Sequence, residues 1–375
     1  MKRTHGVYIL VAAAVLAAVG TGCKGDPGDP GETTVVNLDG FAPGITCGKC
    51  HNADQDTVYY VAGRAHQWEQ SKHAKGGDIE RNGAGCAGCH TTEGFVQRMK
   101  GQTVTDQFQP SPPGCFACHS PHTNGDFRRR KEDPVTLKQY IQGAADVTVD
   151  YGVGNLCLQC HQPRSMSPVM DANAAGDSIV ITTTRWYMHY GIQGLILGGG
   201  GGFRFTDFTY TGNSTHTDHA IIKEQGCPTC HMAEMAYGAP GNVGGAGTGK
   251  GGGHTMNIRY TWDGVEGSVL TGCKTSGCHG TITTVDYNGV QTRTLAYLDT
   301  LQTLLIAKGY LEGNPSSSSY LQAKLTGGKL VIKPAVKAGA LYNYFIIEHD
   351  MSNGVHNTKL TTELLQSSIA ELRKP

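Results

Sequence analysis

Six copies of one short cysteine–histidine pattern dominate this chain. Five copies have the spacing Cys-x-x-Cys-His, and the sixth has four residues between its cysteines before the same Cys-His pair. Together they use twelve of the thirteen cysteines. In chain order, the first to sixth motifs are Cys47–His51, Cys86–His90, Cys115–His119, Cys157–His161, Cys227–His231 and Cys273–His279.

This pattern is the covalent attachment site of c-type haem. Two thiols reach two vinyl groups on one edge of the porphyrin, and the adjacent histidine supplies a nitrogen to the iron. Thioredoxin-like motifs and zinc ribbons do not require that histidine, and disulfides would not produce a fixed spacing. We therefore expect six c-type haems. Their thiols are Cys47, Cys50, Cys86, Cys89, Cys115, Cys118, Cys157, Cys160, Cys227, Cys230, Cys273 and Cys278, and their proximal iron ligands are His51, His90, His119, His161, His231 and His279.

The sixth motif has an alternative interpretation because of its longer spacing. Cys273 and Cys278 are close enough in sequence to form a local disulfide. Stretched haem motifs do occur among multihaem cytochromes, and this copy keeps both cysteines and the histidine. We predict that it carries haem like the other five.

The composition fits a chain with cofactors in its interior. Of 375 residues, 38% are hydrophobic and only 7% aromatic, whereas a chain of this length ordinarily buries a large side-chain core. We expect the haems to be much of the core, in a mostly α and irregular, haem-packed fold with few short strands and C-terminal helices. The formal net charge is zero, so the sequence lacks the excess of basic residues that is typical of nucleic-acid-binding proteins.

The N-terminus has the features of an export signal. Lys2 and Arg3 precede the apolar run Val7–Val19, which is too short to span a bilayer comfortably. We assign residues 1–22 to a signal peptide, with a buried helix as the alternative. Export also agrees with haem attachment, which takes place outside the cytoplasm in c-type cytochromes.

Cys23 is the cysteine that no motif uses. It follows the signal in Gly20–Cys23, which resembles a bacterial lipoprotein box, although that box usually has an aliphatic residue at the position of Gly20. Upstream cleavage would instead leave a free thiol, a liability in an oxidising compartment. We expect lipidation of Cys23, a flexible tether over residues 23–40 and a hexahaem domain over residues 41–375.

This order of lipid anchor, tether and haem domain resembles the surface-anchored multihaem cytochromes of metal-reducing bacteria. The resemblance implies an outer-membrane or cell-surface lipoprotein, with a periplasmic protein as the alternative.

Periodicity in the haem domain predicts a few regular elements. Residues 178–183 and 203–210 alternate like short strands, and residues 281–292 resemble a hairpin with Asn288-Gly289 at its turn. Apolar residues at helical spacing predict three helices near the C-terminus, at residues 294–308, 335–348 and 361–372.

Nine histidines outside the motifs and the signal compete to be distal ligands. They are His66, His73, His122, His189, His216, His219, His254, His349 and His356. Electron-transfer haems often take a second imidazole as an iron ligand, so six haems require six distal histidines. His122 is too close to His119 to reach the opposite face of the same haem, and would ligate a neighbouring one. His66 is the alternative to His73, because we expect it one or two turns away on the same helix face, and His219 is the alternative to His216.

The surroundings of six of these histidines resemble multihaem cytochromes related to pentahaem nitrite reductase and octahaem tetrathionate reductase. The similar segments are Trp68–Ala74, Cys118–His122, His189–Gly194, Asn213–Thr217, Gly252–Asn257 and Gly354–Asn357. The resemblance implies that the distal ligands are His73, His122, His189, His216, His254 and His356.

Three functions remain open. The first is electron transfer through six haems in outer-membrane or extracellular respiration, with redox partner proteins or an external electron acceptor. The second is reduction of a small nitrogen or sulfur oxyanion at one open iron. Related nitrite reductases use a proximal Lys there, and no motif here ends in Lys, since Lys49 is inside its motif. The third is an oligomer stacked into a conducting filament, which a membrane-bound lipid anchor would disfavour.

Overall fold

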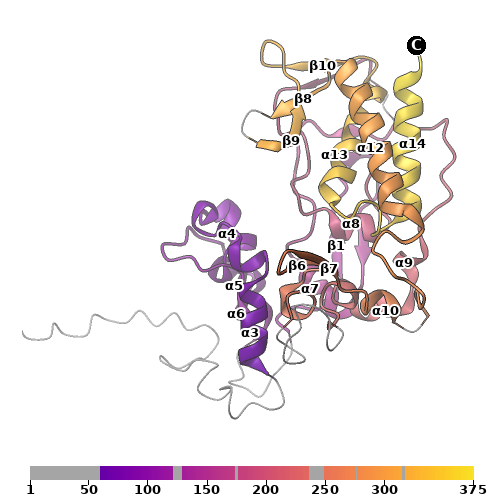
Figure 1. Cartoon of the computed structure of the whole chain (residues 1–375). Coiled ribbons are helices and arrows are strands. Elements are labelled where there is room, and N and C mark those ends of the chain that lie inside the picture. Colours follow the sequence, from indigo (N-terminus) through magenta and orange to yellow (C-terminus); the bar gives the residue numbers. More distant parts are fainter. Residues whose placement is uncertain (1–59, 121–128, 174–175, 236–248, 276, 315–316) are drawn as a thin grey trace, which may run out of the picture. The chain divides into compact units, whose positions relative to one another are not determined.

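The structure is a computed structural model that describes residues 60–120, 129–173, 176–235, 249–275, 277–314 and 317–375. These residues all belong to one unit, Thr46–Pro375. Helices and irregular segments make up most of the described part, with short strands between them (Figure 1). The predicted fold class, mostly α and irregular with few strands and C-terminal helices, is confirmed.

Three long helices close the chain and pack side by side (Figure 1). They are α12 (Val290–Ala307), α13 (Ala338–Asp350) and α14 (Thr358–Arg373). All three were predicted, with ends that differ by a few residues. Gly309 follows α12 with a φ of 75°, a left-handed conformation that favours glycine at a helix end.

Helix α13 lies in the interior, since nearly every residue along it is buried. Asn343 on this helix accepts the backbone N–H of Phe203 (2.6 Å) and donates to the Phe203 carbonyl (2.9 Å) and to Ser368 Oγ on α14 (3.0 Å). A buried amide satisfied in this way ties the irregular segment around Phe203 to both helices.

A continuous apolar core joins these helices to the strands of the middle of the chain. Its fully buried members include Leu137, Trp186, Leu301 and Leu364. A second, small cluster of Phe95, Ala117 and Leu156 packs against Cys118 and Cys160, which belong to the third and fourth motifs. The protein therefore has a side-chain core of its own between residues 135 and 372, to which the apolar faces of the predicted C-terminal helices contribute.

The strands of the described segments form five pairs. Four are antiparallel and one, β2 with β4, is parallel. The pairs are β1 (Val135–Leu137) with β3 (Val147–Val149), β2 (Ile141–Gln142) with β4 (Met170–Asp171), β5 (Ile179–Ile181) with β10 (Leu330–Ile332), β6 (Arg259–Trp262) with β7 (Val265–Ser268), and β8 (Leu311–Asn314) with β9 (Ser317–Ala323). Strand β5 confirms the strand predicted at 178–183.

Two predicted β elements are wrong. Residues 203–210 form no strand, because Asn343 and the hydroxyl of Tyr210 take up backbone groups of Phe203 and Phe205 that a strand partner would need. Residues 281–292 form no hairpin. Asn288 and Gly289 do have positive φ, 54° and 65°, but they lead into the first turn of α12.

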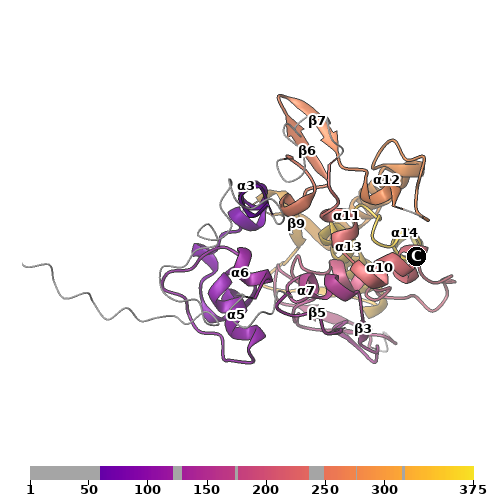
Figure 2. The ribbon, with the colours of Figure 1, turned by 90° about the horizontal axis from the view of Figure 1, so that it is seen from below.

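The remaining helices are short and carry most of the cysteine motifs. The α-helices are α3 (Val61–Glu69), α4 (Ala84–His90), α5 (Thr92–Met99), α6 (Cys115–Cys118), α7 (Asn155–Leu158), α8 (Gln193–Leu197), α9 (Thr215–Asp218), α10 (Ala220–Gln225) and α11 (Pro228–His231). The 3₁₀ turns are η1 (His73–Lys75), η2 (Ile79–Arg81), η4 (Gly152–Gly154), η5 (Gly253–Thr255), η6 (Gly272–Lys274), η7 (Tyr287–Gly289) and η8 (Ala335–Lys337). Figure 2 shows several of these short helices from below.

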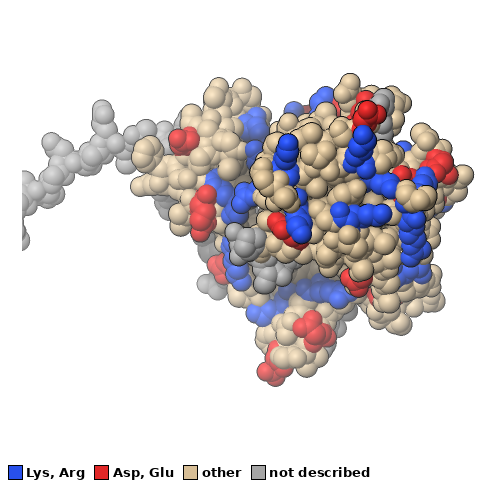
Figure 3. Space-filling view, turned by 90° about the horizontal axis from the view of Figure 1, so that it is seen from above, with Lys and Arg blue, Asp and Glu red and all other residues tan. Residues whose placement is uncertain are grey.

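Charged side chains of both signs are interspersed on the face seen in Figure 3. Lys223 and Asp218 form an exposed ion pair at 3.0 Å. Within the described residues, no helix is both long and apolar enough to cross a membrane.

Candidate haem-binding sites

Each regular motif in the described part of the chain places its histidine one helical turn after its first cysteine. The backbone N–H of His119, His161 and His231 donates to the carbonyl of the first cysteine of the same motif, at 2.8, 2.9 and 2.9 Å. In the second motif, helix α4 spans both cysteines and ends at His90. One turn of helix therefore holds two thiols and an imidazole in a fixed arrangement.

The stretched sixth motif closes in the same way. Despite its two extra residues, the N–H of His279 donates to the carbonyl of Cys273 at 2.8 Å. Gly277, with a φ of 84°, turns the backbone in a conformation that other residues rarely adopt. Cys273 and Cys278 are free thiols and not a disulfide, so both are available to a haem.

Five motif histidines each face one of the predicted distal histidines. The ring centres lie 5.9 to 6.4 Å apart, and the planes cross at 23° to 76°. The pairs are His90 with His189, His119 with His254, His161 with His73, His231 with His356, and His279 with His216. All five pairs join segments that are distant in sequence.

This spacing fits one iron between two imidazoles. Metal–imidazole bonds of about 2 Å, with each nitrogen about 1.1 Å from its ring centre, separate the two centres by about 6.2 Å. Direct contacts between aromatic rings span about 4.5–7 Å. These five pairs stand out because each joins a motif histidine to a predicted distal histidine at nearly the same separation. The donor chemistry, two neutral imidazoles beside two thiols, is that of c-type haem.

Hydrogen bonds to Nδ1 orient several of these rings. His161 donates to Gln193 Oε1 (3.0 Å), His216 to the carbonyl of Val355 (2.9 Å) and His231 to the carbonyl of Met256 (3.1 Å). His356 donates to Asp350 Oδ1 at 2.7 Å. A proton fixed on Nδ1 leaves the Nε2 lone pair for a metal, as is usual for metal-binding histidines.

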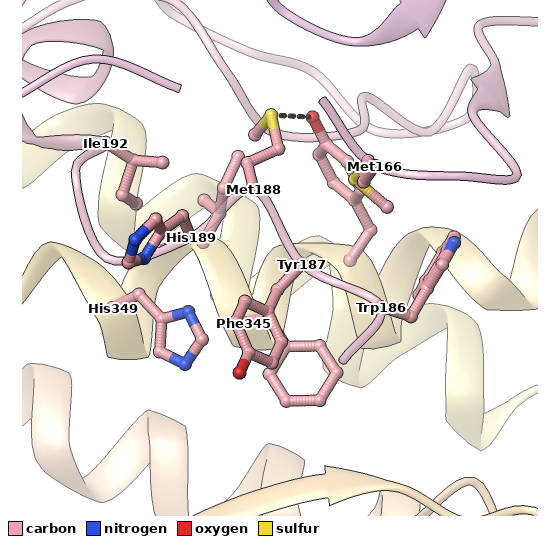
Figure 4. Close-up of a pocket in the computed structure, with 10 residues that line it drawn as sticks. Met166, Trp186, Tyr187, Met188, His189, Ile192, Phe345 and His349 are labelled. Carbon is pink, nitrogen blue, oxygen red and sulfur yellow. Dashed lines mark hydrogen bonds between the residues drawn. The ribbon is translucent and has the colours of Figure 1, made fainter. Parts of the chain in front are cut away.

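His189 differs from these four. Its Nδ1 accepts the backbone N–H of Tyr190 at 2.8 Å, and its φ of 64° is left-handed. Figure 4 shows His189 beside His349 at a small cavity of about 10 Å³, roughly the space that one water molecule needs. Neutral His189 in this hydrogen bond keeps its proton on Nε2.

The three histidines judged not to be ligands lie elsewhere. His66 is largely exposed, 3.6 Å from Glu69, and belongs to α3, whereas His73 begins the separate turn η1. The expectation that these two share a helix face is therefore wrong. His219 caps α10 by accepting the N–H of Ile221. His349 is buried against Tyr187 and Tyr190 and pairs with Glu348 at 2.9 Å.

Burial is the main influence on the protonation of the paired rings. It lowers the pKa of His73, His189, His231 and His254 to about 4. Burial also acts to lower the pKa of His356, but the charge and hydrogen bond of Asp350 outweigh it, and this pKa lies above its usual value.

Neighbouring motifs lie against one another. Arg98 Nη1 is 3.1 Å from Cys89 Sγ, and its Nη2 is 3.9 Å from Cys160 Sγ, so one guanidinium spans the second and fourth motifs. A hydrogen bond between the thiols of Cys157 and Cys227 raises the pKa of the former and joins the fourth motif to the fifth. Burial and the neighbouring thiols of the sixth motif raise the pKa of Cys230 to about 11.

A cavity of about 490 Å³ opens beside the second motif. Its lining includes Cys86, Cys89, Arg98, Cys160 and Arg164. This volume is within the range of about 300–1,000 Å³ that is typical of cofactor and ligand sites. The space therefore suits a planar group held by the two thiols.

Comparison with known proteins gives one similar structure. No protein-family model matches the chain, and no curated protein matches it. The chain is similar to a crystal structure of the outer cell wall cytochrome OcwA, with a TM-score of 0.45 and 19% identity over 83% of this chain. The match covers 50% of that protein, so this chain spans about half of its length.

Several predicted site residues lie outside the described residues. They are Cys23, Cys47, Cys50, His51 and His122. Their predicted roles, including a sixth pair between His51 and a distal histidine, remain predictions.

Sequence reasoning missed the residues that orient the rings. Gln193, Asp350 and Met256 each contact one or more paired histidines. None belongs to a motif. Met256 contacts two paired rings, through its backbone carbonyl at His231 and through its thioether sulfur, 2.9 Å from Nδ1 of His73. Gln193 lies inside the segment His189–Gly194 that was singled out for its histidine.

Proposed function

We propose that this chain is a hexahaem c-type cytochrome that carries electrons, with two histidines at each iron. The five facing histidine pairs carry this proposal, because each joins a motif histidine to a predicted distal histidine at the separation that one iron between two imidazoles requires. When bound, haem supplies an iron that takes up and releases one electron. Two imidazoles at each iron suit that task, because they leave no position for a substrate.

The residues would divide the work within each site. The motif cysteines anchor the porphyrin covalently, and the motif histidine holds one face of the iron. A histidine from a distant segment would supply the second ligand, and at His216 and His356 a hydrogen bond donated by Nδ1 would fix the orientation of that ring. In the sixth site, for example, Cys273 and Cys278 are the anchors, His279 and His216 are the ligands, and Val355 orients His216.

Contacts between motifs support a connected series of sites. The second and fourth motifs share Arg98, the fourth and fifth share the Cys157–Cys227 contact, and the fifth and sixth are neighbours through Cys230. Burial and the charge of Cys157 raise the pKa of Cys118 to about 12, so the third motif also borders the fourth. With haems attached, this arrangement would bring porphyrin edges together, as electron transfer requires.

The test uses the purified, full-length holoprotein. We expect six haems per chain in a pyridine haemochrome assay with intact mass, and only low-spin signals in the electron paramagnetic resonance spectrum of the oxidised protein. A high-spin signal near one full haem, with rapid binding of nitrite, hydroxylamine or sulfite, would overturn the proposal in favour of the reductase alternative.

We further propose that Cys23 anchors the protein to the outer membrane or cell surface, where it would serve respiration through a redox partner protein or an external acceptor. The support is its position directly after the signal-like segment. Cys23→Ala should release the cytochrome into the soluble fraction with its haems intact. A wild-type protein that is already soluble, with an unacylated N-terminus, would contradict the anchor without affecting the haem proposal.

A further inference from the structure

The turn between α13 and α14 holds a buried carboxylate against a paired histidine. Asp350, the last residue of α13, is only 2% exposed. Its Oδ1 accepts from Nδ1 of His356 at 2.7 Å, and its Oδ2 accepts from the hydroxyl of Ser352. The same hydroxyl accepts the backbone N–H of His356 at 3.2 Å. Both carboxylate oxygens are therefore engaged, one of them by the ring.

The backbone of this turn is held in one conformation. Met351, Asn353 and Gly354 all have positive φ, at 59°, 51° and 90°. A side chain at Gly354 would meet Thr294 Oγ1 of α12 at 2.5 Å, so the turn is packed against that helix. Asn357 then caps α14 by accepting the N–H of Leu360. This packing fixes the position of His356 relative to Asp350.

Other paired histidines have neutral partners. His161 donates to an amide, and His216 and His231 donate to backbone carbonyls. A carboxylate attracts the Nδ1 proton more strongly than a neutral oxygen does, and charge-assisted hydrogen bonds are roughly twice as strong as neutral ones. The ring of His356, which faces the ring of His231, consequently carries more negative character at Nε2, the nitrogen that Asp350 does not contact.

We propose that Asp350 sets the fifth site to a lower reduction potential than it would have with a neutral partner, by making His356 a stronger donor to iron. This inference rests on the proposed function. With haem bound, its iron would accept one electron from a redox partner, or from the electrode in the experiment below, while the proton would stay on Nδ1 of His356. The more electron-rich ligand and the nearby negative charge would both stabilise the ferric form more than the ferrous form, because ferric iron carries the greater positive charge.

The experiment is a spectroelectrochemical titration of the full-length holoprotein and its Asp350→Asn variant. Asparagine keeps the shape and an acceptor oxygen but removes the charge. Mutations of residues that hydrogen-bond to metal ligands typically change metal affinity or activity 10- to 100-fold. We expect one haem to become at least tenfold easier to reduce, an upward shift of about 59 mV or more for a one-electron couple. His356→Ala identifies the same titration step, because it turns that iron high-spin.

Two further variants keep the test decisive if Asp350→Asn folds poorly. Ser352→Ala removes a donor from Asp350, so it should shift the same haem in the opposite direction. Glu348→Gln is the control, because Glu348 pairs with His349, which is not one of the facing histidines. It should shift every haem potential by less than Asp350→Asn shifts that of the fifth site. Unchanged potentials in Asp350→Asn and Ser352→Ala, with six low-spin haems in the wild type, would overturn the inference alone. Missing or high-spin haems in the wild type would instead count against the proposed function.

Discussion

His216 Nδ1 lies 2.9 Å from the carbonyl oxygen of Val355, and the next residue along the chain, His356, faces His231. One turn between α13 and α14 therefore supports two neighbouring sites. It orients the distal histidine of the sixth site and supplies that of the fifth.

His216→Ala should leave the sixth haem attached but turn one iron high-spin, because the ring that faces His279 is lost. His219→Ala is the matched control, since His219 caps α10 and contacts no motif histidine ring at this spacing. Electron paramagnetic resonance spectra of the two oxidised variants show which of them contains a high-spin haem. A high-spin haem in His219→Ala but not in His216→Ala would reverse the assignment.

Gly277→Ala should lower haem loading at the sixth motif. A φ of 84° strains any residue with a Cβ, by about 1–2 kcal/mol, and this turn lets His279 reach the carbonyl of Cys273. Intact mass should reveal a fraction of chains with five haems. Gly280→Ala is the control, because a Cβ there meets nothing within 4 Å and Gly280 has no positive φ. Equal loading of the two variants would mean that the turn is not needed for attachment.

Carbon monoxide should bind the reduced protein poorly, and first at the second site. To ligate iron through Nε2, His189 must move its proton to Nδ1, where it meets the N–H of Tyr190. Breaking this hydrogen bond weakens His189 as a ligand. In stopped-flow experiments, His189→Ala should accelerate the first phase of carbon monoxide binding and leave the slower phases as they were. If the variant adds a separate fast phase and keeps the original first phase, another site is the most labile.

Asn343→Ala should destabilise the protein by about 2–4 kcal/mol, because it leaves the buried N–H and carbonyl of Phe203 without partners. Thermal or guanidinium unfolding followed by circular dichroism measures the loss. Ser368→Ala removes only one of the bonds of Asn343 and should have an effect of about 1 kcal/mol. Similar losses in both variants would show that the amide contributes little beyond that hydroxyl.

The sequence predicted the local features well and the long-range ones less well. Helices α12 and α14 follow from leucine periodicity, and the motifs follow from spacing alone. The strand predicted around Phe203 failed because a distant side chain, Asn343, satisfies its backbone. Asn288-Gly289 has the backbone conformation expected of a hairpin turn, but it precedes a helix, since no second strand follows it.

The pairing of histidines was beyond sequence reasoning in a physical sense. A ring such as His73 carries no local sign that His161 is its partner, because only the tertiary fold brings them together. What the sequence did supply was the set of candidates. Each of the five pairs in the described residues joins a motif histidine to one of the six preferred distal histidines.

The long span of these five pairs bears on how the chain would fold. If an iron links each pair, every link closes a large loop, and several loops interleave: His73 to His161 encloses His90, whose partner His189 lies beyond it. Closing such loops removes freedom from the unfolded chain, as disulfides do in small secreted domains. The attached cofactors would then serve as cross-links as well as redox centres, and a chain without them would be a far looser molecule.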